Sequence, residues 1–155
     1  MSTSLFDAIR NADVSMVTSL VKENPSLAQE KDQRGSTALL LATYYGHMDI
    51  VRVILQQPQD INTQDASGNT ALMGVCFKGY SAIAKLLIKS GADVNISNFN
   101  GATALIFAAT FNKPEIAALL LAHGADKSAI DDKGNTALEH AKMQSSDAVL
   151  ALLEA

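Results

Sequence analysis

Apolar residues in the stretch SAIAKLLIKS, at 81–90, recur at spacings of three and four, as Ile83, Leu86 and Leu87 show. This spacing places them on one face of a helix, so the pattern predicts an amphipathic helix over 81–90. The preceding run, ALMGVCFK at 71–78, is mostly apolar and predicts a helix of about two turns. The two segments together predict a helix pair.

Turn residues bound this helix pair on each side. Gly79 separates the two helices, and Gly91 follows the second one, where glycine accepts the positive φ that ends many helices. Before the first helix, DASGNT at 65–70 predicts a tight turn, and the hydroxyl of Thr70 is placed to cap the helix. The unit is therefore a turn, a short helix, a second turn and a longer helix.

The same unit recurs every 33 residues. Its turn glycine is followed each time by Thr-Ala-Leu after one intervening residue, and the four copies are Gly35, Gly68, Gly101 and Gly134. Three helical slots recur in phase: Ile50, Ile83, Ile116 and Val149; Ile54, Leu87, Leu120 and Leu153; and the small slot Ala42, Val75, Ala108 and Ala141. Helices this short are unstable alone, so a fixed period indicates stacked pairs that bury one another. We predict an all-α solenoid.

The period divides the chain, taken as one domain over 1–155, into five units. These are an N-terminal cap at 1–32, inner repeats at 33–65, 66–98 and 99–131, and a C-terminal cap at 132–155. The first cap lacks the Thr-Ala-Leu turn. The last unit has polar residues where the inner repeats are mostly apolar, namely Glu139, Lys142, Gln144 and Glu154. A terminal repeat needs such a water-facing side, so we expect a complete stack of three repeats between two caps.

These motifs resemble the ankyrin repeat along the whole chain. The matching segments are GSTALLLATYYGHMDIVRVIL, GNTALMGVCFKGYSAIAKLLIKSGADVN and GATALIFAATFNKPEIAALLLAHGAD. The family pattern is a turn glycine, Thr-Pro-Leu-His, Gly-His, an Ile-Val-x-x-Leu-Leu helix and Gly-Ala-Asp-Val-Asn. The resemblance implies recognition of other macromolecules through a concave face made of turn tips and first helices. The small size is also similar to stand-alone bacterial ankyrin proteins, including accessory, immunity and effector proteins.

The chain departs from the family pattern at four kinds of position. Thr-Pro is Thr-Ala in every copy, at Ala38, Ala71, Ala104 and Ala137. The family histidine is replaced, at Leu40, Met73, Ile106 and Glu139, which predicts apolar packing in its place. Asn112 replaces the glycine between two helices, and asparagine tolerates the left-handed conformation. Pro58 replaces the glycine after a second helix and cannot adopt positive φ, so we expect that loop to differ from its neighbours.

Composition excludes several classes of partner and location. The net charge is −4, and the 12 Lys and Arg are scattered along the chain, whereas nucleic-acid binding calls for a basic stripe. No apolar run reaches the roughly 18 residues of a membrane span. Cys76 is the only cysteine, so an intrachain disulfide is impossible. With no signal-peptide pattern at the start, we expect a cytoplasmic protein.

The residues that could carry chemistry are read as structural. The three histidines, His47, His123 and His140, are not spaced as metal ligands, and none has a carboxylate at a telling spacing. Cys76 falls in a small-residue position of a first helix, which favours a buried filler over a nucleophile. Asn95, in the sequon NIS, is the loop asparagine of the repeat, and we expect it to form loop hydrogen bonds. We predict no catalytic residue, metal or cofactor, and hence no enzyme.

The variable surface of the stack is the candidate binding site. Five of the eight aromatic residues fall among the turn tips and the exposed side of the first helices: Tyr44, Tyr45, Phe77, Phe99 and Phe111. Aromatic side chains beside a cation are typical of binding hot spots, and Arg34 and Lys78 fall in the same set. The alternative for Tyr44 and Phe77 is packing between neighbouring repeats.

The resulting functional hypothesis is a non-enzymatic, monomeric module that binds a partner protein of acidic or mixed surface through this aromatic face. The alternative is self-association, or assembly as a regulatory subunit of a co-expressed enzyme or effector. A self-pairing face would give a dimer without any partner, so light scattering separates the two.

Overall fold

The computed structural model describes residues 2–155, and this part of the chain consists of helices, turns and loops. The first helices of the pairs are α1 (Ser2–Arg10), α3 (Ala38–Tyr45), α5 (Ala71–Lys78), α7 (Ala104–Thr110) and α9 (Ala137–Met143). The second helices are α2 (Val14–Glu23), α4 (Met48–Leu55), α6 (Ser81–Lys89), α8 (Pro114–Ala122) and α10 (Asp147–Glu154), with a 3₁₀-helix, η1 (Pro25–Gln29), after α2. The predicted all-α solenoid is confirmed, and α5 and α6 begin at the predicted residues.

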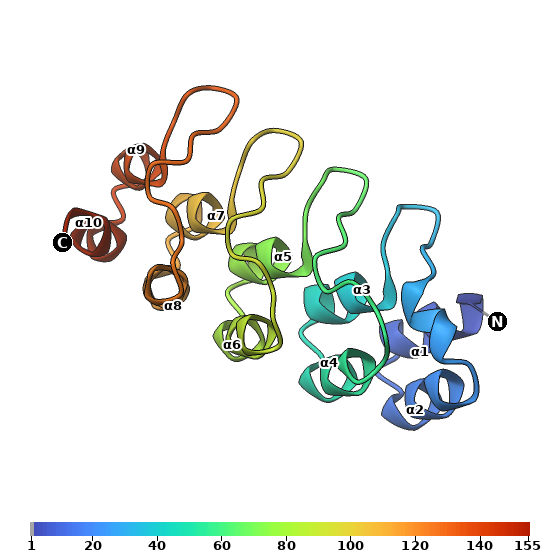
Figure 1. Ribbon diagram of the computed structural model, residues 1–155. Helices are drawn as coiled ribbons and strands as arrows, with labels where there is room; N and C mark the ends of the chain where they lie inside the picture. Colours follow the sequence, from blue (N-terminus) through green and yellow to red (C-terminus); the bar gives the residue numbers. More distant parts are fainter. Residues whose placement is uncertain (1) are drawn as a thin grey trace.

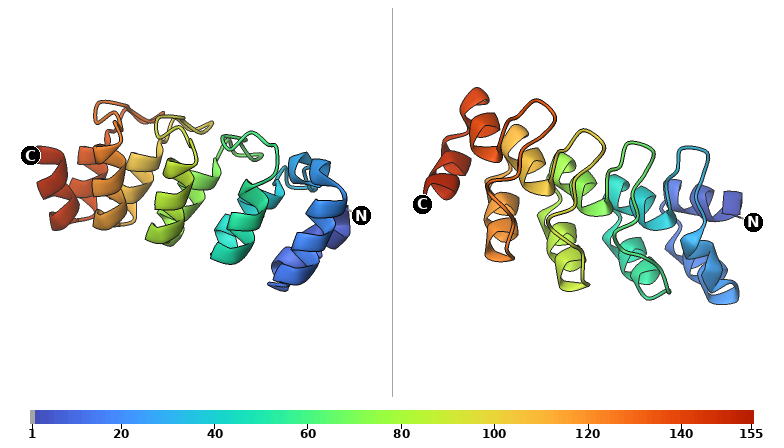
Figure 2. Two further views of the ribbon diagram at one scale, coloured as in Figure 1. Left: turned by 60° about the horizontal axis from the view of Figure 1, so that its bottom comes forward. Right: turned by 45° about the horizontal axis from the view of Figure 1, so that its top comes forward.

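The helix pairs stack in one row, with the two ends of the chain at opposite ends of it (Figure 1). Each first helix contacts the next, from α1 through α3, α5 and α7 to α9. The second helices form a parallel layer, and the turn tips all project from the same side of the stack (Figure 2). None of the helices within residues 2–155 combines the length and the apolar character that a bilayer crossing needs.

The core consists of the recurrent apolar slots predicted from the period. Every residue of the three helical slots keeps at most 7% of its surface exposed. At the family's histidine position, Met73 and Ile106 are buried and Leu40 is half-buried, so apolar packing does replace the histidine there. Glu139, at the same position of the last unit, makes a polar contact instead. Its carboxylate accepts a hydrogen bond from the backbone N–H of Thr136, 3.0 Å away, at the start of α9.

Threonine caps begin four of the five first helices. Thr70 accepts the N–H of Met73 at 3.3 Å, as predicted. The equivalent bonds, also 3.3 Å, are made by Thr37, Thr103 and Thr136. Each satisfies one of the N–H groups that a helix start leaves without a partner.

The loop after α4 differs from its counterparts, as Pro58 predicts. After α6, Gly91 adopts φ 103° and the N–H of Ala92 returns to the carbonyl of Leu87, 3.0 Å away. Pro58 cannot take that conformation. At the register position of Ala92, the side-chain amide of Gln59 donates to the carbonyl of Ile54 instead. A side chain thus donates to the carbonyl that a backbone N–H reaches in the loops after α6 and α8.

Two further positions behave as the sequence predicts. Asn112 has a φ of 55°, in the left-handed region, and Pro114 opens α8 two residues later. In the neighbouring loop, Asn95 accepts the N–H of Asp126 at 2.8 Å and donates to the carbonyl of Gly124 at 3.1 Å. Asn95 therefore ties one loop to the next, which confirms its predicted role in loop hydrogen bonding.

Proline is expected to stabilise the chain where the family has it. Ala71 and Ala104 are the first residues of α5 and α7, and the residues before them, Thr70 and Thr103, have the extended backbone that proline requires of its predecessor. Ala71→Pro and Ala104→Pro should each raise the free energy of unfolding by roughly 0.4–1 kcal/mol, because proline restricts the unfolded chain. Urea denaturation measures this, and a loss of stability in both variants would contradict the helix starts.

Removing either of two hydroxyls in the C-terminal unit should change the free energy of unfolding, with opposite signs for the two. In the described part of the chain, the Ser146 hydroxyl is buried and has no hydrogen-bond partner. A buried hydroxyl without a partner lowers the free energy of unfolding by about 1–3 kcal/mol. Ser146→Ala should therefore stabilise the chain by about 1 kcal/mol. Thr136→Ala is the matched control and should destabilise by about 1 kcal/mol, since it removes a working cap. Thermal unfolding of the two variants tests the pair, and shifts of the same sign would contradict it.

Candidate functional site: a groove between the turn tips and the first helices

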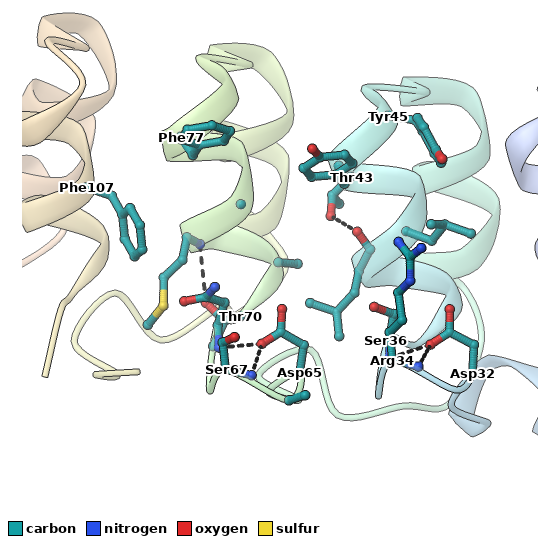
Figure 3. Close-up of a pocket in the computed structure, with 18 of the residues that line it drawn as sticks. Asp32, Arg34, Ser36, Thr43, Tyr45, Asp65, Ser67, Thr70, Phe77 and Phe107 are labelled. Carbon is teal, nitrogen blue, oxygen red and sulfur yellow. Dashed lines mark hydrogen bonds between the residues drawn. The ribbon is translucent and has the colours of Figure 1, made fainter. Parts of the chain in front are cut away.

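A groove of about 730 Å³ lies between the turn tips and the first helices of the stack. Its walls are the turn tips at 32–36 and 65–69 on one side and the exposed sides of α3, α5 and α7 on the other. Figure 3 shows Asp32, Arg34, Asp65 and Ser67 at the tip side, with Tyr45 and Phe77 on the helices opposite. We call this space the groove.

The turn tips have a defined shape because each is built around one side-chain oxygen. Oδ1 of Asp65 accepts the N–H groups of Ser67 and Asn69, both at 2.9 Å, and Oδ1 of Asp32 makes the same pair of bonds in its own tip. The tip at 65–69 is also linked to the tip that follows it, since the N–H of Phe99 donates to the carbonyl of Ser67 at 3.1 Å. The groove therefore has a preformed tip wall.

One aromatic cluster occupies the α3 part of the groove. The rings of Tyr44 and Tyr45 meet edge to face with centroids 5.8 Å apart, and Tyr45 stacks on the imidazole of His47. The ammonium of Lys78, from the next repeat, lies 4.8 Å from the centroid of the Tyr44 ring. This is within the range of a cation–π interaction.

A second cluster joins α5 to α7. The rings of Phe77 and Phe111 meet edge to face at 4.7 Å, and Phe107 stacks on Phe111 at 6.2 Å. Phe77 therefore does pack between repeats, as the alternative interpretation holds, yet 44% of its surface remains exposed. Contact with a neighbour and availability to a partner coexist at this position.

Five of the seven predicted site residues line the groove: Arg34, Tyr44, Tyr45, Phe77 and Phe111. Lys78 is not part of the lining but reaches Tyr44, which is. Phe99 lies outside the groove, and 67% of its surface is exposed. Its ring rests on the preceding tip, where a Cβ added to Gly68 would lie 2.7 Å from Cδ1 of Phe99. Phe99 thus covers a tip glycine outside the groove lining, and its part in partner binding stays a prediction.

Sequence reasoning missed three features of the groove lining. Phe107 lies four residues before Phe111, on the same face of α7, and that spacing was a usable signal. Arg10 comes from the end of α1, and only the stacking of the first cap brings it to the groove. Gly74 is an interior residue of α5 that presents no side chain to the groove at all.

Charged side chains of both signs surround the groove. Arg10 lies 3.3 Å from a carboxylate oxygen of Asp7 and 3.9 Å from one of Asp32. Within residues 2–155, the guanidinium of Arg34 and the ammonium of Lys78 form no ion pair with a carboxylate. The carboxylates of Asp32 and Asp65 are engaged in the tip turns. The lining thus carries two basic side chains, Arg10 and Arg34, and two acidic ones, Asp32 and Asp65, and it is the lack of an ion pair that distinguishes Arg34 and the nearby Lys78.

The polar groups elsewhere hold the fold together. Nε2 of His140 lies 2.7 Å from Oδ2 of Asp131, a pairing that the sequence interpretation did not foresee. The N–H of Asn135 and then the His140 ring hold the pKa of Asp131 below its usual value. Cys76 is fully buried, as predicted for a filler, and this burial raises the pKa of its thiol. The described residues contain no cluster of three or more potential metal ligands.

Comparison with known proteins agrees with this geometry. A family model described as ankyrin repeats (3 copies) matches residues 5–98, and a second, described as ankyrin repeats (many copies), matches residues 86–141. Curated proteins give no significant match. The repeated tips, the stacked helix pairs and the family match over more than half of its length show that the chain belongs to the ankyrin-repeat family.

Proposed function

We propose that this chain is a non-enzymatic module that binds a partner protein through the groove. Ankyrin repeats are generally protein–protein interaction modules, and ankyrin domains are typically not enzymes. The observation that carries the proposal is the exposure of four aromatic rings that line one groove. Tyr44, Tyr45, Phe77 and Phe111 keep 46, 42, 44 and 38% of their surface exposed.

The physical argument rests on what these rings gain from a partner. An aromatic ring that stays more than a third exposed has apolar surface left to bury, and each such contact is large and rigid. Gathered exposed apolar side chains usually mark interaction sites, whereas single ones need no explanation. The edge-to-face contacts between Tyr44 and Tyr45 and between Phe77 and Phe111 also hold the rings in place before binding, which lowers the entropy lost on association.

The proposal also covers the oligomeric state, the repeat boundaries and the cellular compartment of the module. We propose a monomer, with the repeat boundaries that the 33-residue period indicates. Cys76 is a free thiol and buried, which suits the reducing cytoplasm as the compartment we propose. The alternative is that the same aromatic face pairs with a second copy of the chain or with a co-expressed enzyme or effector.

Comparative affinity capture tests the proposed function. Tagged wild type is incubated with native lysate beside a groove variant, Tyr45→Ser with Phe111→Ser, and a convex-side control, Arg52→Ala with Lys85→Ala. We expect a protein that the wild type and the control retain equally and the groove variant loses. Light scattering of purified wild type separates the alternative, because self-pairing gives a dimer that the groove variant lacks. A partner retained equally by all three proteins would reject the groove as the site.

A further inference from the structure

One groove-facing position of the first helices holds a different residue in each repeat. In register with Gly74 are Leu41 in α3, Phe107 in α7 and His140 in α9. Leu41, Gly74 and Phe107 all line the groove, and the contacts of α5 with both α3 and α7 place them on consecutive helices. The helix side of the groove therefore has a bulky side chain, a gap and another bulky side chain.

The fold does not require glycine at this position. Gly74 lies within α5, its N–H donates to the carbonyl of Thr70 at 3.2 Å, and its φ is not in the left-handed region. Apart from its chain neighbours and the backbone of its own helix, a Cβ added there would have no atom within 4 Å. Glycine inside a helix is less stable than alanine, so this chain carries a cost that no contact in the structure explains. Where a local rule is broken without a structural gain, function is the expected reason.

The surroundings of the gap define what it would accept. Met73, Phe77 and Phe107 line the groove beside it, so the gap has apolar neighbours. Lys78 lies one helical turn after Gly74, and Arg34 stands on the tip wall. Neither cation is paired with a carboxylate in the part of the chain that the structure describes. An occupant that complements these groups combines a bulky apolar side chain with a nearby negative charge.

We propose that Gly74 opens a subsite for a bulky apolar side chain on a partner segment that carries a carboxylate within a few residues of it. The carboxylate engages Arg34 or Lys78, and the apolar side chain fills the space between Leu41 and Phe107. This inference rests on the proposed function, since it names the chemistry that the groove selects. It also identifies Gly74 as a specificity-determining position.

Peptide selection followed by matched variants tests the subsite. A random peptide library displayed on phage is selected on wild-type protein, and an enriched peptide is then synthesised with a fluorescent label. We expect enriched sequences to place Asp or Glu within a few residues of Leu, Met or an aromatic residue. Fluorescence polarisation should show that Gly74→Leu, which copies the Leu41 side chain, weakens binding by about 30-fold or more, as loss of an anchor does.

Two controls separate the subsite from general damage. Gly74→Ala should raise the thermal midpoint, because alanine is more stable than glycine inside a helix. It should weaken binding less than Gly74→Leu, because a methyl group fills less of the gap. Ala118→Leu adds the same bulk at an exposed position of α8, outside the groove, and should leave binding unchanged. A peptide with its apolar anchor replaced by Ala should bind wild type and Gly74→Leu equally.

The outcomes distinguish the subsite from the proposed function. If Gly74→Leu binds the peptide as wild type does while Tyr45→Ser does not, the subsite is wrong and the groove remains the binding site. If both variants bind normally, the proposed function fails as well. Enrichment of basic peptides would overturn the charge preference, and a selection that enriches no peptide would overturn the assignment of a linear segment as the occupant.

Discussion

Leu87→Ala and Leu120→Ala should each lower the free energy of unfolding by about 2–5 kcal/mol. Both leucines are fully buried members of the hydrophobic core, at the same slot of α6 and α8. Truncation removes the transfer free energy of the lost methyl groups and leaves a cavity that a stack of short helices cannot easily close. Urea denaturation followed by circular dichroism gives the values.

The matched control for Leu87 is two residues away. Lys89 lies at the end of the same helix with its side chain in water, so Lys89→Ala should change the free energy of unfolding by no more than roughly 0.5 kcal/mol. If the leucine and lysine variants lose the same stability, the face of α6 described as buried does not form the core in solution.

Removing the groove aromatics should abolish most partner binding while leaving a folded stack. The combined change Tyr45→Ser, Phe77→Ser and Phe111→Ser should weaken affinity by at least about 2 kcal/mol, because hot-spot side chains dominate such interfaces. Stability should fall as well, since Phe77 and Phe111 contact each other at 4.7 Å and such pairs contribute about 0.5–1.5 kcal/mol. Titration calorimetry with a captured partner and thermal unfolding measure the two effects.

Tyr45→Ser alone keeps this prediction testable if the triple variant unfolds. Its aromatic contacts, with Tyr44 and His47, are all on the surface of one repeat. The single change should therefore cost little stability and still reduce affinity. Phe99→Ser is the contrasting variant, because Phe99 covers Gly68 outside the groove. Equal losses of affinity for Tyr45→Ser and Phe99→Ser would contradict a contact surface confined to the groove, because Phe99 is not part of its lining.

The fold was predictable from sequence because its determinants are local and repeated. A slot such as that of Leu87 recurs four times in phase, so any one ambiguous position is corrected by the other copies. The helix starts follow from Thr70 and its equivalents, whose capping bond joins residues only three positions apart. The consequence of Pro58 was also readable, since a fixed φ excludes the left-handed glycine conformation.

Features that depend on a partner in a different repeat were harder to predict. Phe99 was assigned to the concave face by register, but its ring lies on a glycine 31 positions earlier. The His140–Asp131 pair joins a helix to a tip across nine residues, at a spacing that matches no helical or metal-ligand pattern. The gap at Gly74 was not predicted from the sequence, because the candidate site was chosen from the side chains present, and glycine has none.

Hydrogen exchange of the protein with and without its captured partner tests the central claim most directly. The claim is that the partner occupies the groove, so backbone amides should gain protection in the tips at 32–36 and 65–69 and in α3 and α5. The second helices α4, α6 and α8 form the other layer of the stack and should exchange as in the free protein. Protection that appears on the second helices and leaves the tips unchanged would contradict the account.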